Sequence, residues 1–382
     1  MANPHSRLKP IRALVDAEDS DPAVSTELLD LAKWMSAYYH HPLGEVLATV
    51  LPAAARRGAE FSITPPDCWH VTKPEYKSPR APRQQQLLEF LLNSPASSGA
   101  AIIAAGFSRA LLNKLVELSV VERCDPLTES RAKESHLTAT AEQTFAIEQV
   151  EHVLGSFQTL LLEGVTGSGK TEIYLQSIAK VIERGGQALV LVPEIALTPQ
   201  TLARFQRRFA RTGMLHSALT DNERLQTWLK CRQGDFDIVL GTRSAIFTPY
   251  RNLQLIIVDE EHETSYKQID PSPRYNARDV ASKMAQIHNS KLLLGSATPS
   301  MEMMELVEQK KIGYVVLDKR YHDVSMPEIQ CADLKVAHKK KKMRGIFTPL
   351  LLDAIQDTLR ENKQVILFQN RRGYAPREMC MV

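Results

Sequence analysis

Residues 164–171 read GVTGSGKT, a pattern of residue types that suits the binding of a nucleoside triphosphate. The stretch matches G-x-x-x-x-G-K-[ST], the signature of a phosphate-binding loop. Glycines in such a loop let backbone N–H groups turn toward phosphate oxygens, and the N-terminus of the following helix adds positive dipole character. Lys170 can then reach the β- and γ-phosphates, and Thr171 can bind Mg²⁺ through its hydroxyl. We predict phosphate contacts from Gly164, Val165, Thr166, Gly167, Ser168, Gly169, Lys170 and Thr171.

An acidic cluster supplies the second half of such a site. The apolar run 253–258 predicts a buried strand, and Asp259 and Glu260 follow it directly. Ligand sites of open α/β sheets lie at the carboxyl ends of the strands. We therefore predict that Asp259 holds Mg²⁺, usually through water, and that Glu260 orients and deprotonates the attacking water. The predicted catalytic residues are Lys170, Asp259 and Glu260.

The elements that must position these residues can be read from the pattern of apolar runs. Between about residues 136 and 317, strand-length runs alternate with helical stretches; the runs are TLLLEG, ALVLVP, DIVLGT, LQLIIVDE and KLLLGS. Continuous apolar runs are typical of strands buried on both faces, and helices between them imply right-handed crossovers. The predicted fold class is therefore α/β with a parallel sheet.

The residues before this region follow a different pattern. TELLDLAKWMSAYYHH has the apolar spacing of one buried helix face, and the proline-rich stretch after it indicates a linker. From about residue 83, the order helix, short helix, helix, short strand suits a winged helix-turn-helix. Its third helix would offer Arg109 and Lys114 to a phosphate backbone. A small helical packing module without a DNA role fits the pattern equally well.

Composition bounds the class of protein. No run of about 18 apolar residues occurs, and the first residues lack the apolar core of a signal peptide, so the cytoplasm is the expected compartment. The net charge of +3 decides little about nucleic-acid binding, because basic residues can be local. The five cysteines contain no C-x-x-C pair, which argues against a disulfide framework or a complete zinc site.

Three further motifs indicate what the nucleotide energy acts on. GSATPS, GTRSAIF and PEIALTPQ each follow a predicted strand. Their order and spacing resemble superfamily 2 helicases, in which the S-A-T motif links the γ-phosphate state to the other lobe and the other two motifs lie on the face that tracks a single strand. The resemblance assigns coupling to Ser296 and Thr298. It assigns phosphate contacts to Arg243, Thr242 and Thr198.

With WMSAYYHHPLGEVLATVLPAA, DEEHETSYKQ, PRYNARDVA and VILFQNRRGYAP, the set of motifs resembles the bacterial primosomal protein N′ (PriA) family of replication-restart helicases over nearly the whole chain. The resemblance implies a RecA-like P-loop parallel sheet as helicase lobe 1, preceded by a winged-helix domain and followed by the start of a second RecA-like lobe. The implied divisions are 1–60, the end of an N-terminal 3′-end DNA-binding domain; 61–82, a linker; 83–130, the winged helix; 135–325, lobe 1; and 326–382, the start of lobe 2.

The family implies an ATP-dependent 3′-to-5′ DNA helicase that binds and remodels stalled replication forks and promotes primosome assembly for replication restart. Its cofactors would be ATP and Mg²⁺. Its partners would be forked and single-stranded DNA, other primosome proteins, single-strand-binding protein and the replicative helicase loader. Gln143 would read the adenine.

The segment that follows DEEH resembles the family's aromatic-rich loop, which couples DNA to hydrolysis by base stacking and charge pairing. The residues carried over to this role are Tyr266, Lys267, Arg274, Tyr275 and Arg278. The alternative is a surface loop whose tyrosines pack locally.

Three departures from the family bear on activity. The N-terminal domain is present only from near LKPIRALV, and most of the second lobe, with its arginine finger, is missing. Cys380 stands alone where the first of the family's paired zinc ligands belongs, an incomplete site. We therefore expect a fragment that binds nucleotide, hydrolyses it slowly and does not unwind DNA.

Two other classes share these motifs. One is a non-catalytic ATP- and DNA-binding module. The other is a different superfamily 2 motor, such as a type I restriction subunit or an RNA helicase, since DEEH also fits D-E-x-H. The NRRGYAP segment and the YYHHP helix argue against the other motors.

Overall fold

The computed structural model describes residues 24–59, 63, 68–77, 81–93, 97–123, 137–152, 156–320 and 328–368. The chain divides into two compact units, Met1–Val324 and Ser325–Val382. Cys380 lies outside the described residues. Within those residues, no helix is long and apolar enough to cross a membrane.

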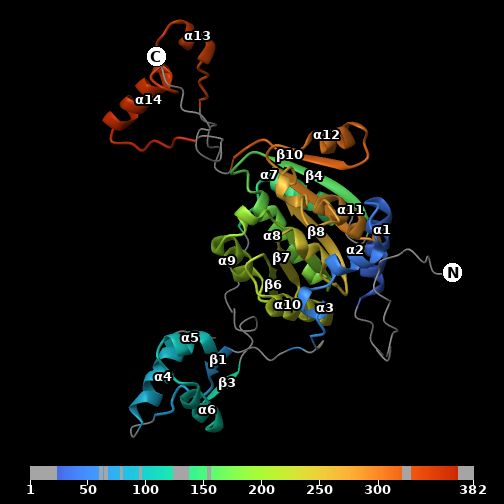
Figure 1. Cartoon of the computed structure of the whole chain (residues 1–382), viewed down its shortest axis with the longest axis vertical. Helices are drawn as coiled ribbons and strands as arrows, with labels where there is room; N and C mark the ends of the chain where they lie inside the picture. The colour runs from blue at the N-terminus through green and yellow to red at the C-terminus, as the bar shows by residue number, and fades with distance from the viewer. Residues whose placement is uncertain are drawn as a thin grey trace, which may run out of the picture. The chain divides into compact units, whose positions relative to one another are not determined.

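A seven-stranded parallel sheet forms the centre of the first unit. Figure 1 shows this sheet among the helices that surround it. The strand order is β10-β4-β9-β8-β5-β7-β6. The strands are β4 (Gln158–Gly164), β5 (Gln187–Leu191), β6 (Thr212–Leu215), β7 (Ile238–Gly241), β8 (Leu253–Asp259), β9 (Lys291–Ser296) and β10 (Gly313–Leu317). All five apolar runs predicted as strands are strands, and the α/β class is confirmed. The sequence did not indicate β6 and β10, which are the edge strands: β6 (TGML) starts with Thr and Gly and is not a continuous apolar run, and β10 alternates between buried and exposed residues.

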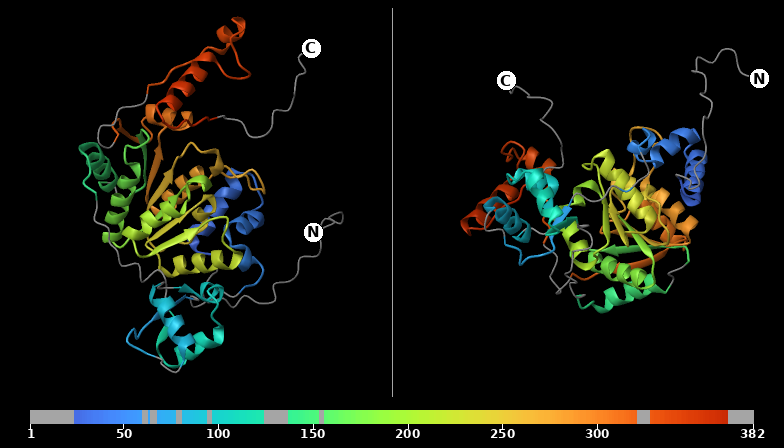
Figure 2. Two further views of the ribbon diagram at one scale, coloured as in Figure 1. Left: turned by 90° about the vertical axis from the view of Figure 1, so that its left-hand side faces the viewer. Right: turned by 90° about the horizontal axis from the view of Figure 1, so that it is seen from below.

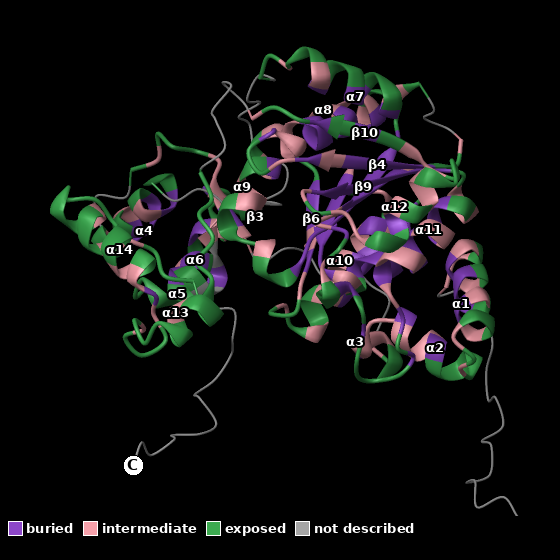
Figure 3. Cartoon of the chain, turned by 90° about the horizontal axis from the view of Figure 1, so that it is seen from above, coloured by how far each residue is buried: buried purple, intermediate pink, exposed green. Residues whose placement is uncertain are grey.

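Helices cover both faces of the sheet (Figure 2). On one face lie α7 (Ala141–Glu151), α8 (Lys170–Glu183) and α9 (Pro199–Arg208). On the other lie α10 (Asp221–Gln233), α11 (Ala277–His288) and α12 (Met301–Glu308). Alternate strand residues feed the two cores: Leu161 joins one, and Leu160 and Leu162 join the other. The inner strands are therefore buried on both sides, as the purple strands of Figure 3 show, whereas the edge strand β10 is partly exposed.

The N-terminal helices belong to the same packed body. They are α1 (Thr26–Tyr38), α2 (Leu43–Val50) and α3 (Ala53–Arg56), and their buried residues share one core with α10 and α11. Leu28, Leu31 and Met35 are fully buried, as the spacing predicts, whereas Tyr38 is 56% exposed. The predicted domain boundary at residue 60 thus does not coincide with a break in packing. The apolar face of α1 packs into the core of the predicted helicase lobe and not into a separate core.

Residues 68–123 form a small module with its own core. Its helices are α4 (Pro82–Asn93), α5 (Gly99–Ala104) and α6 (Arg109–Glu117), and its antiparallel strands are β1 (Cys68–Val71), β2 (Ser97–Ser98) and β3 (Val121–Arg123). The predicted order of helices and strand is present. The central strand β1, however, lies inside the range expected to be a linker. CWHV carries no proline, and its Trp69 is 4% exposed within the module core.

The second unit holds α13 (Leu334–Lys339) and α14 (Pro349–Arg360). The run QVILFQ has strand-like composition, but residues 364–368 form no strand: they have no strand pairing, and Ile366 and Phe368 are 93% and 86% exposed. A strand needs a hydrogen-bonded neighbour, and no strand lies within residues 328–368. The basic run at 339–342 is exposed.

Candidate functional site

The phosphate-binding motif has the local structure that the sequence predicts. It connects β4 to α8, and Gly167 and Gly169 both have a φ of 87°, the left-handed region that favours glycine. Gly164 is needed for a different reason, because a Cβ there would lie 2.6 Å from Ser168 Oγ. The Lys170 ammonium donates a hydrogen bond to the Gly164 carbonyl at 2.8 Å and so stays folded over the loop.

A cavity of about 720 Å³ opens over this loop. The loop residues 165–171 line it together with Gln143, Asp259 and Glu260. The structure thus brings both halves of the predicted site to one place, at the carboxyl ends of β4 and β8. The sequence patterns did not predict the remaining residues that line the cavity, which are Leu137, Thr138, Glu172, Leu175, Arg204 and Arg208.

Two of the missed residues form a nearly buried ion pair. Arg208 on α9 contacts Glu172 on α8 at 3.0 Å, and their side chains are 5% and 11% exposed. The pair ties α9 to the helix that begins at the P-loop. Glu172 follows the GKT motif directly, but nothing in the sequence pairs it with an arginine 36 positions away.

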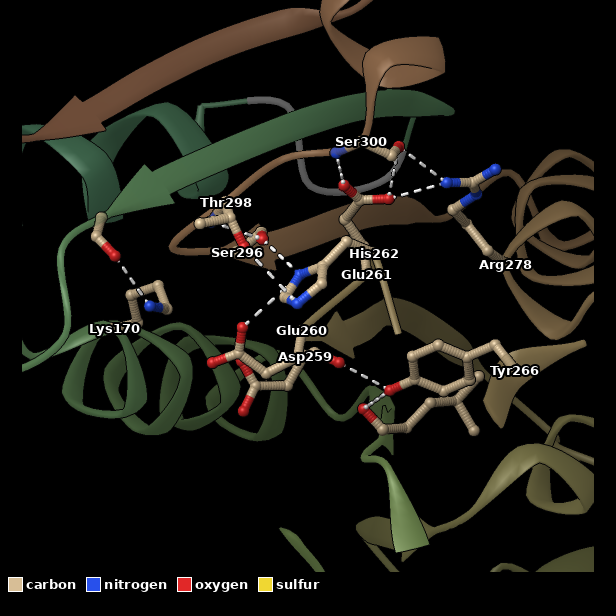
Figure 4. Close-up of polar contacts among 12 residues, drawn as sticks. Lys170, Asp259, Glu260, Glu261, His262, Tyr266, Arg278, Ser296, Thr298 and Ser300 are labelled. Carbon is tan, nitrogen blue, oxygen red and sulfur yellow. Dashed lines mark hydrogen bonds and ion pairs between the residues drawn. The ribbon is translucent and has the colours of Figure 1, made fainter. Parts of the chain in front are cut away.

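Asp259 is held firmly at the end of β8 (Figure 4). Its Oδ1 accepts a hydrogen bond from the Tyr174 hydroxyl at 2.8 Å. Burial raises the pKa of Asp259, and the Tyr174 hydrogen bond works in the opposite direction. A bound divalent cation would favour the carboxylate, so the metal and the ionised form of Asp259 support each other.

The donor set at this edge fits Mg²⁺ and not zinc. The Thr171 hydroxyl and the Asp259 carboxylate line the same two adjoining cavities, and hard oxygen donors are the ligands that Mg²⁺ prefers. Mg²⁺ commonly takes one or two protein ligands and completes its shell with water and phosphate oxygens. No cluster of three or more His, Cys, Asp or Glu side chains that could hold a metal occurs among the described residues.

Gln143 has a different immediate task from the one predicted. It is 3% exposed, and its amide Nε2 donates to the Ser168 carbonyl at 2.8 Å. Its Oε1 accepts from the backbone N–H of Thr140 in a capping box that starts α7. In this conformation the side chain braces the P-loop, and adenine recognition by Gln143 stays a prediction.

The S-A-T motif contacts the acidic cluster through a histidine. Ser296 Oγ lies 2.8 Å from His262 Nδ1, and Thr298 Oγ1 lies 3.5 Å from His262 Nε2 (Figure 4). His262 Nδ1 is also 3.8 Å from a Glu260 carboxylate oxygen. A change in charge at Glu260 or on the nucleotide can therefore reach Ser296 through one imidazole.

Arg278, which was predicted to contact DNA, is held inside the lobe in this conformation. Its guanidinium forms an ion pair of 2.8 Å with Glu261, whose side chain is fully buried. Glu261 also accepts hydrogen bonds from the backbone N–H and the hydroxyl of Ser300, at 2.6 and 3.0 Å. The network joins DEEH, the start of α11 and the segment after GSATP. The sequence offered Glu261 only as one of three neighbouring acids.

The two tyrosines predicted to stack on bases are also internal. Tyr266 and Tyr275 are each 1% exposed, so neither ring presents a face to a base in this conformation. The Tyr266 hydroxyl donates to the carbonyls of Asp259 and Leu191, at 2.6 and 3.0 Å. Tyr275 packs edge-on against Phe247, with ring centroids 5.1 Å apart.

The predicted cations of this region divide into two kinds. Arg243, in the 3₁₀ helix Arg243–Phe247, donates to the carbonyl of Lys267 at 3.0 Å and lies over the Tyr275 ring. Lys267 and Arg274 are exposed. Of the motif hydroxyls, Thr198 caps α9 and Thr242 is 5% exposed. Lys267 and Arg274 are therefore the predicted DNA contacts in this loop that remain accessible.

Comparisons with known proteins identify the family. A family model described as DEAD/DEAH box helicase matches residues 140–306, and one described as the PriA 3′ DNA-binding domain matches residues 1–52. Replication restart protein PriA of Haemophilus influenzae is 38% identical over 97% of this chain and 52% of its own length. The PriA proteins of Bacillus subtilis and Chlamydia pneumoniae are 39% and 34% identical, over 79% and 99% of this chain and 39% and 53% of their own lengths.

This chain belongs to the PriA family. It spans about half the length of the PriA relatives that it matches. The match to the 3′ DNA-binding model covers α1 and α2, the helices that pack on the helicase lobe.

In this PriA-family chain, α1 contacts the loop after DEEH directly. The Tyr39 hydroxyl accepts a hydrogen bond from the backbone N–H of Asn276 at 3.1 Å. The Lys267 ammonium lies 5.7 Å from the centre of the Tyr39 ring. Lys267 and Asn276 also form an isolated antiparallel bridge at the base of the loop. The sequence gave no sign of this contact, which joins residues 237 positions apart.

Proposed function

We propose that this chain binds ATP with Mg²⁺ at the P-loop edge, as the nucleotide-binding lobe of an ATP-dependent 3′-to-5′ DNA helicase. In the PriA family setting, the work of that helicase is the binding and remodelling of stalled forks and the promotion of primosome assembly for replication restart. The supporting observation is that Lys170, Asp259 and Glu260 converge on one cavity.

The chemistry follows from the side chains around that cavity. Lys170 and the loop amides neutralise the phosphates, and Thr171 and Asp259 hold the metal, which when bound draws charge from the β- and γ-oxygens. Glu260 orients the attacking water. Through His262 and Ser296, a change at this site can reach α12. The reason is that Glu261, the residue before His262, accepts a hydrogen bond from Ser300, the residue before α12.

We further propose how the surrounding parts serve DNA. Residues 1–60 are the end of a 3′-end DNA-binding domain, residues 83–130 with β1 are a winged helix, residues 135–325 are helicase lobe 1 and residues 326–382 start lobe 2. Arg109 and Lys114 on α6 are exposed and contact the phosphate backbone, as do Lys267 and Arg274. Single-strand-binding protein, other primosome proteins and the helicase loader are the protein partners in the cytoplasm.

Nucleotide binding is tested with a fluorescent ATP analogue and Mg²⁺. We expect Lys170→Ala to weaken binding by at least about tenfold, because it removes a charge-assisted contact to the phosphates worth about 1.5–3 kcal/mol. Lys180→Ala, on the same helix and in a surface ion pair, is the matched control. An unchanged dissociation constant for Lys170→Ala would place the nucleotide elsewhere and overturn the proposal.

The helicase assignment is tested by competition. The chain should prefer forked DNA to duplex RNA, and forked DNA should raise its rate of ATP hydrolysis. Preference for the RNA would favour another superfamily 2 motor instead. Binding of ATP and DNA without any turnover would favour a non-catalytic module.

A further inference from the structure

Tyr174 places a buried hydroxyl against the carboxylate that we assign to Mg²⁺. It lies three residues after Thr171 on α8, so both side chains project from the same face of the helix. The Tyr174 hydroxyl donates to Asp259 Oδ1 at 2.8 Å, and the residue is 1% exposed. This contact joins the P-loop helix to the end of β8 across 85 positions of sequence.

The glycine of the GSATPS motif makes room for this hydroxyl. A Cβ at Gly295 would lie 1.7 Å from the Tyr174 hydroxyl oxygen and 2.9 Å from Cζ of the ring. No side chain fits there unless Tyr174 moves away. Gly295 and Asp259 are paired across β9 and β8, so the phenol lies over the junction of the two strands.

A second tyrosine holds the backbone of the same aspartate. Tyr266 donates to the Asp259 carbonyl at 2.6 Å, while Tyr174 donates to its side chain. With both groups fixed, the carboxylate has little freedom to rotate, and its Oδ2 is left for the metal or a metal-bound water.

We propose that Tyr174 is a positioning residue for Mg²⁺, which orients the Asp259 carboxylate in a space that Gly295 keeps open. This inference rests on the proposed nucleotide function. Residues that orient a metal ligand from behind commonly change metal affinity by about 10–100-fold when they are removed. The cause is the loss of a fixed ligand orientation.

The alternative is that Tyr174 only fills the core between α8 and the sheet. The variant Tyr174→Phe separates the two roles, because it keeps the ring and removes only the hydroxyl. Tyr250→Phe is the matched control: Tyr250 is also buried, at 5% exposed, but it packs in the core on the opposite face of the sheet.

The experiment measures the affinity for a fluorescent ATP analogue twice, once with Mg²⁺ and once with EDTA. For Tyr174→Phe we expect the gain in affinity that Mg²⁺ brings to fall by about tenfold, with the affinity in EDTA unchanged. Tyr250→Phe should match the wild type in both conditions. An unchanged Mg²⁺ gain in Tyr174→Phe, or an equal loss in both conditions, overturns the inference.

The contribution of Gly295 is tested by a double-mutant cycle. Gly295→Ala should also reduce the Mg²⁺ gain, because its methyl group displaces the hydroxyl. In Gly295→Ala combined with Tyr174→Phe, the loss should be close to that of Tyr174→Phe alone, since the hydroxyl is gone and only the ring carbon Cζ, 2.9 Å from the added methyl group, has to shift. Full additivity of the two losses, in variants with wild-type circular dichroism spectra, would separate Gly295 from Tyr174 and overturn that part.

The two proposals fail in different ways. If the wild type binds no nucleotide, or if Lys170→Ala binds as the wild type does, the proposed function fails. If the wild type shows the Mg²⁺ gain and Lys170→Ala weakens binding, but Tyr174→Phe behaves as the wild type, only the inference about Tyr174 fails. A wild type that binds nucleotide without any gain from Mg²⁺ also overturns it.

Discussion

The acidic cluster DEEH lies between two regions in which the sequence predicted the placement of side chains with very different success. On the nucleotide side, Lys170, Thr171, Asp259 and Glu260 all line one cavity, as predicted. On the other side, Tyr266, Tyr275 and Arg278 were expected to contact DNA, yet their side chains are largely buried and contact other residues of the lobe. Glycine loops have their geometry set by local backbone preferences, whereas the direction of a loop side chain is set by what packs around it.

The contrast also concerns how the two regions are connected. Asp259 is oriented by Tyr174 from the nucleotide side and by Tyr266 from the loop side. The loop is in turn anchored by Arg243 and by Tyr39, the residue directly after α1. A movement of the loop can therefore change the position of Asp259 through the Tyr266 hydrogen bond, without any aromatic ring contacting a base.

The largest expected effect comes from breaking the buried ion pair. Glu261→Ala removes the fully buried carboxylate that pairs with the Arg278 guanidinium, which then keeps a longer ion pair of 3.7 Å with the more exposed Asp279. We expect a loss of about 3–5 kcal/mol in the free energy of unfolding, measured by urea denaturation. The surface-pair variant Asp357→Ala should change it by less than about 0.5 kcal/mol. A near-neutral Glu261→Ala would contradict the stabilising role of this ion pair.

The next largest effect is expected from the hydrogen bonds of the buried Tyr266 hydroxyl. Tyr266→Phe removes a buried donor that serves two carbonyl oxygens. We expect it to cost about 1–3 kcal/mol of unfolding free energy. Single-strand affinity should be unchanged, because the Tyr266 ring is buried and the substitution removes only its hydroxyl. A Tyr266→Phe variant as stable as the wild type would contradict the role of this hydroxyl in supporting the lobe.

A smaller effect is expected at the contact between α1 and the loop. Tyr39→Phe removes the acceptor of the Asn276 N–H while keeping the ring beneath Lys267. The expected loss is about 0.5–1.5 kcal/mol in unfolding free energy. Hydrogen exchange at the Asn276 amide should become faster. The neighbouring variant Tyr38→Phe, at a ring that is 56% exposed, should leave that exchange rate unchanged.

The smallest effect on stability, but a clear one on binding, is expected at the exposed part of the loop. Arg274→Ala should change the unfolding free energy by less than about 0.5 kcal/mol. It should weaken single-strand binding and reduce the salt dependence of binding by about one unit of slope. Lys311→Ala, at an exposed cation elsewhere on the lobe, is the control. An unchanged slope for Arg274→Ala would remove this loop from the DNA path.

Several parts of the molecule were predictable from sequence because they depend on near neighbours. The five buried strands carry continuous apolar runs, and the P-loop carries glycines where left-handed backbone is needed. The edge strand β10 was missed because one of its faces is exposed, and β1 was missed because prolines around CWHV indicated a linker. The segment QVILFQ has strand composition but no strand partner within residues 328–368.

By itself, the sequence determined the α/β class, the phosphate loop, the acidic cluster and the family, since each rests on residue types at short, fixed spacing. Tertiary structure alone decided which motif residues face the cavity and which are buried. It joined Tyr174 to Asp259, Arg278 to Glu261 and Tyr39 to Asn276. These contacts join separate parts of the chain, and whether such a side chain meets solvent or another residue depends on packing that no local pattern encodes.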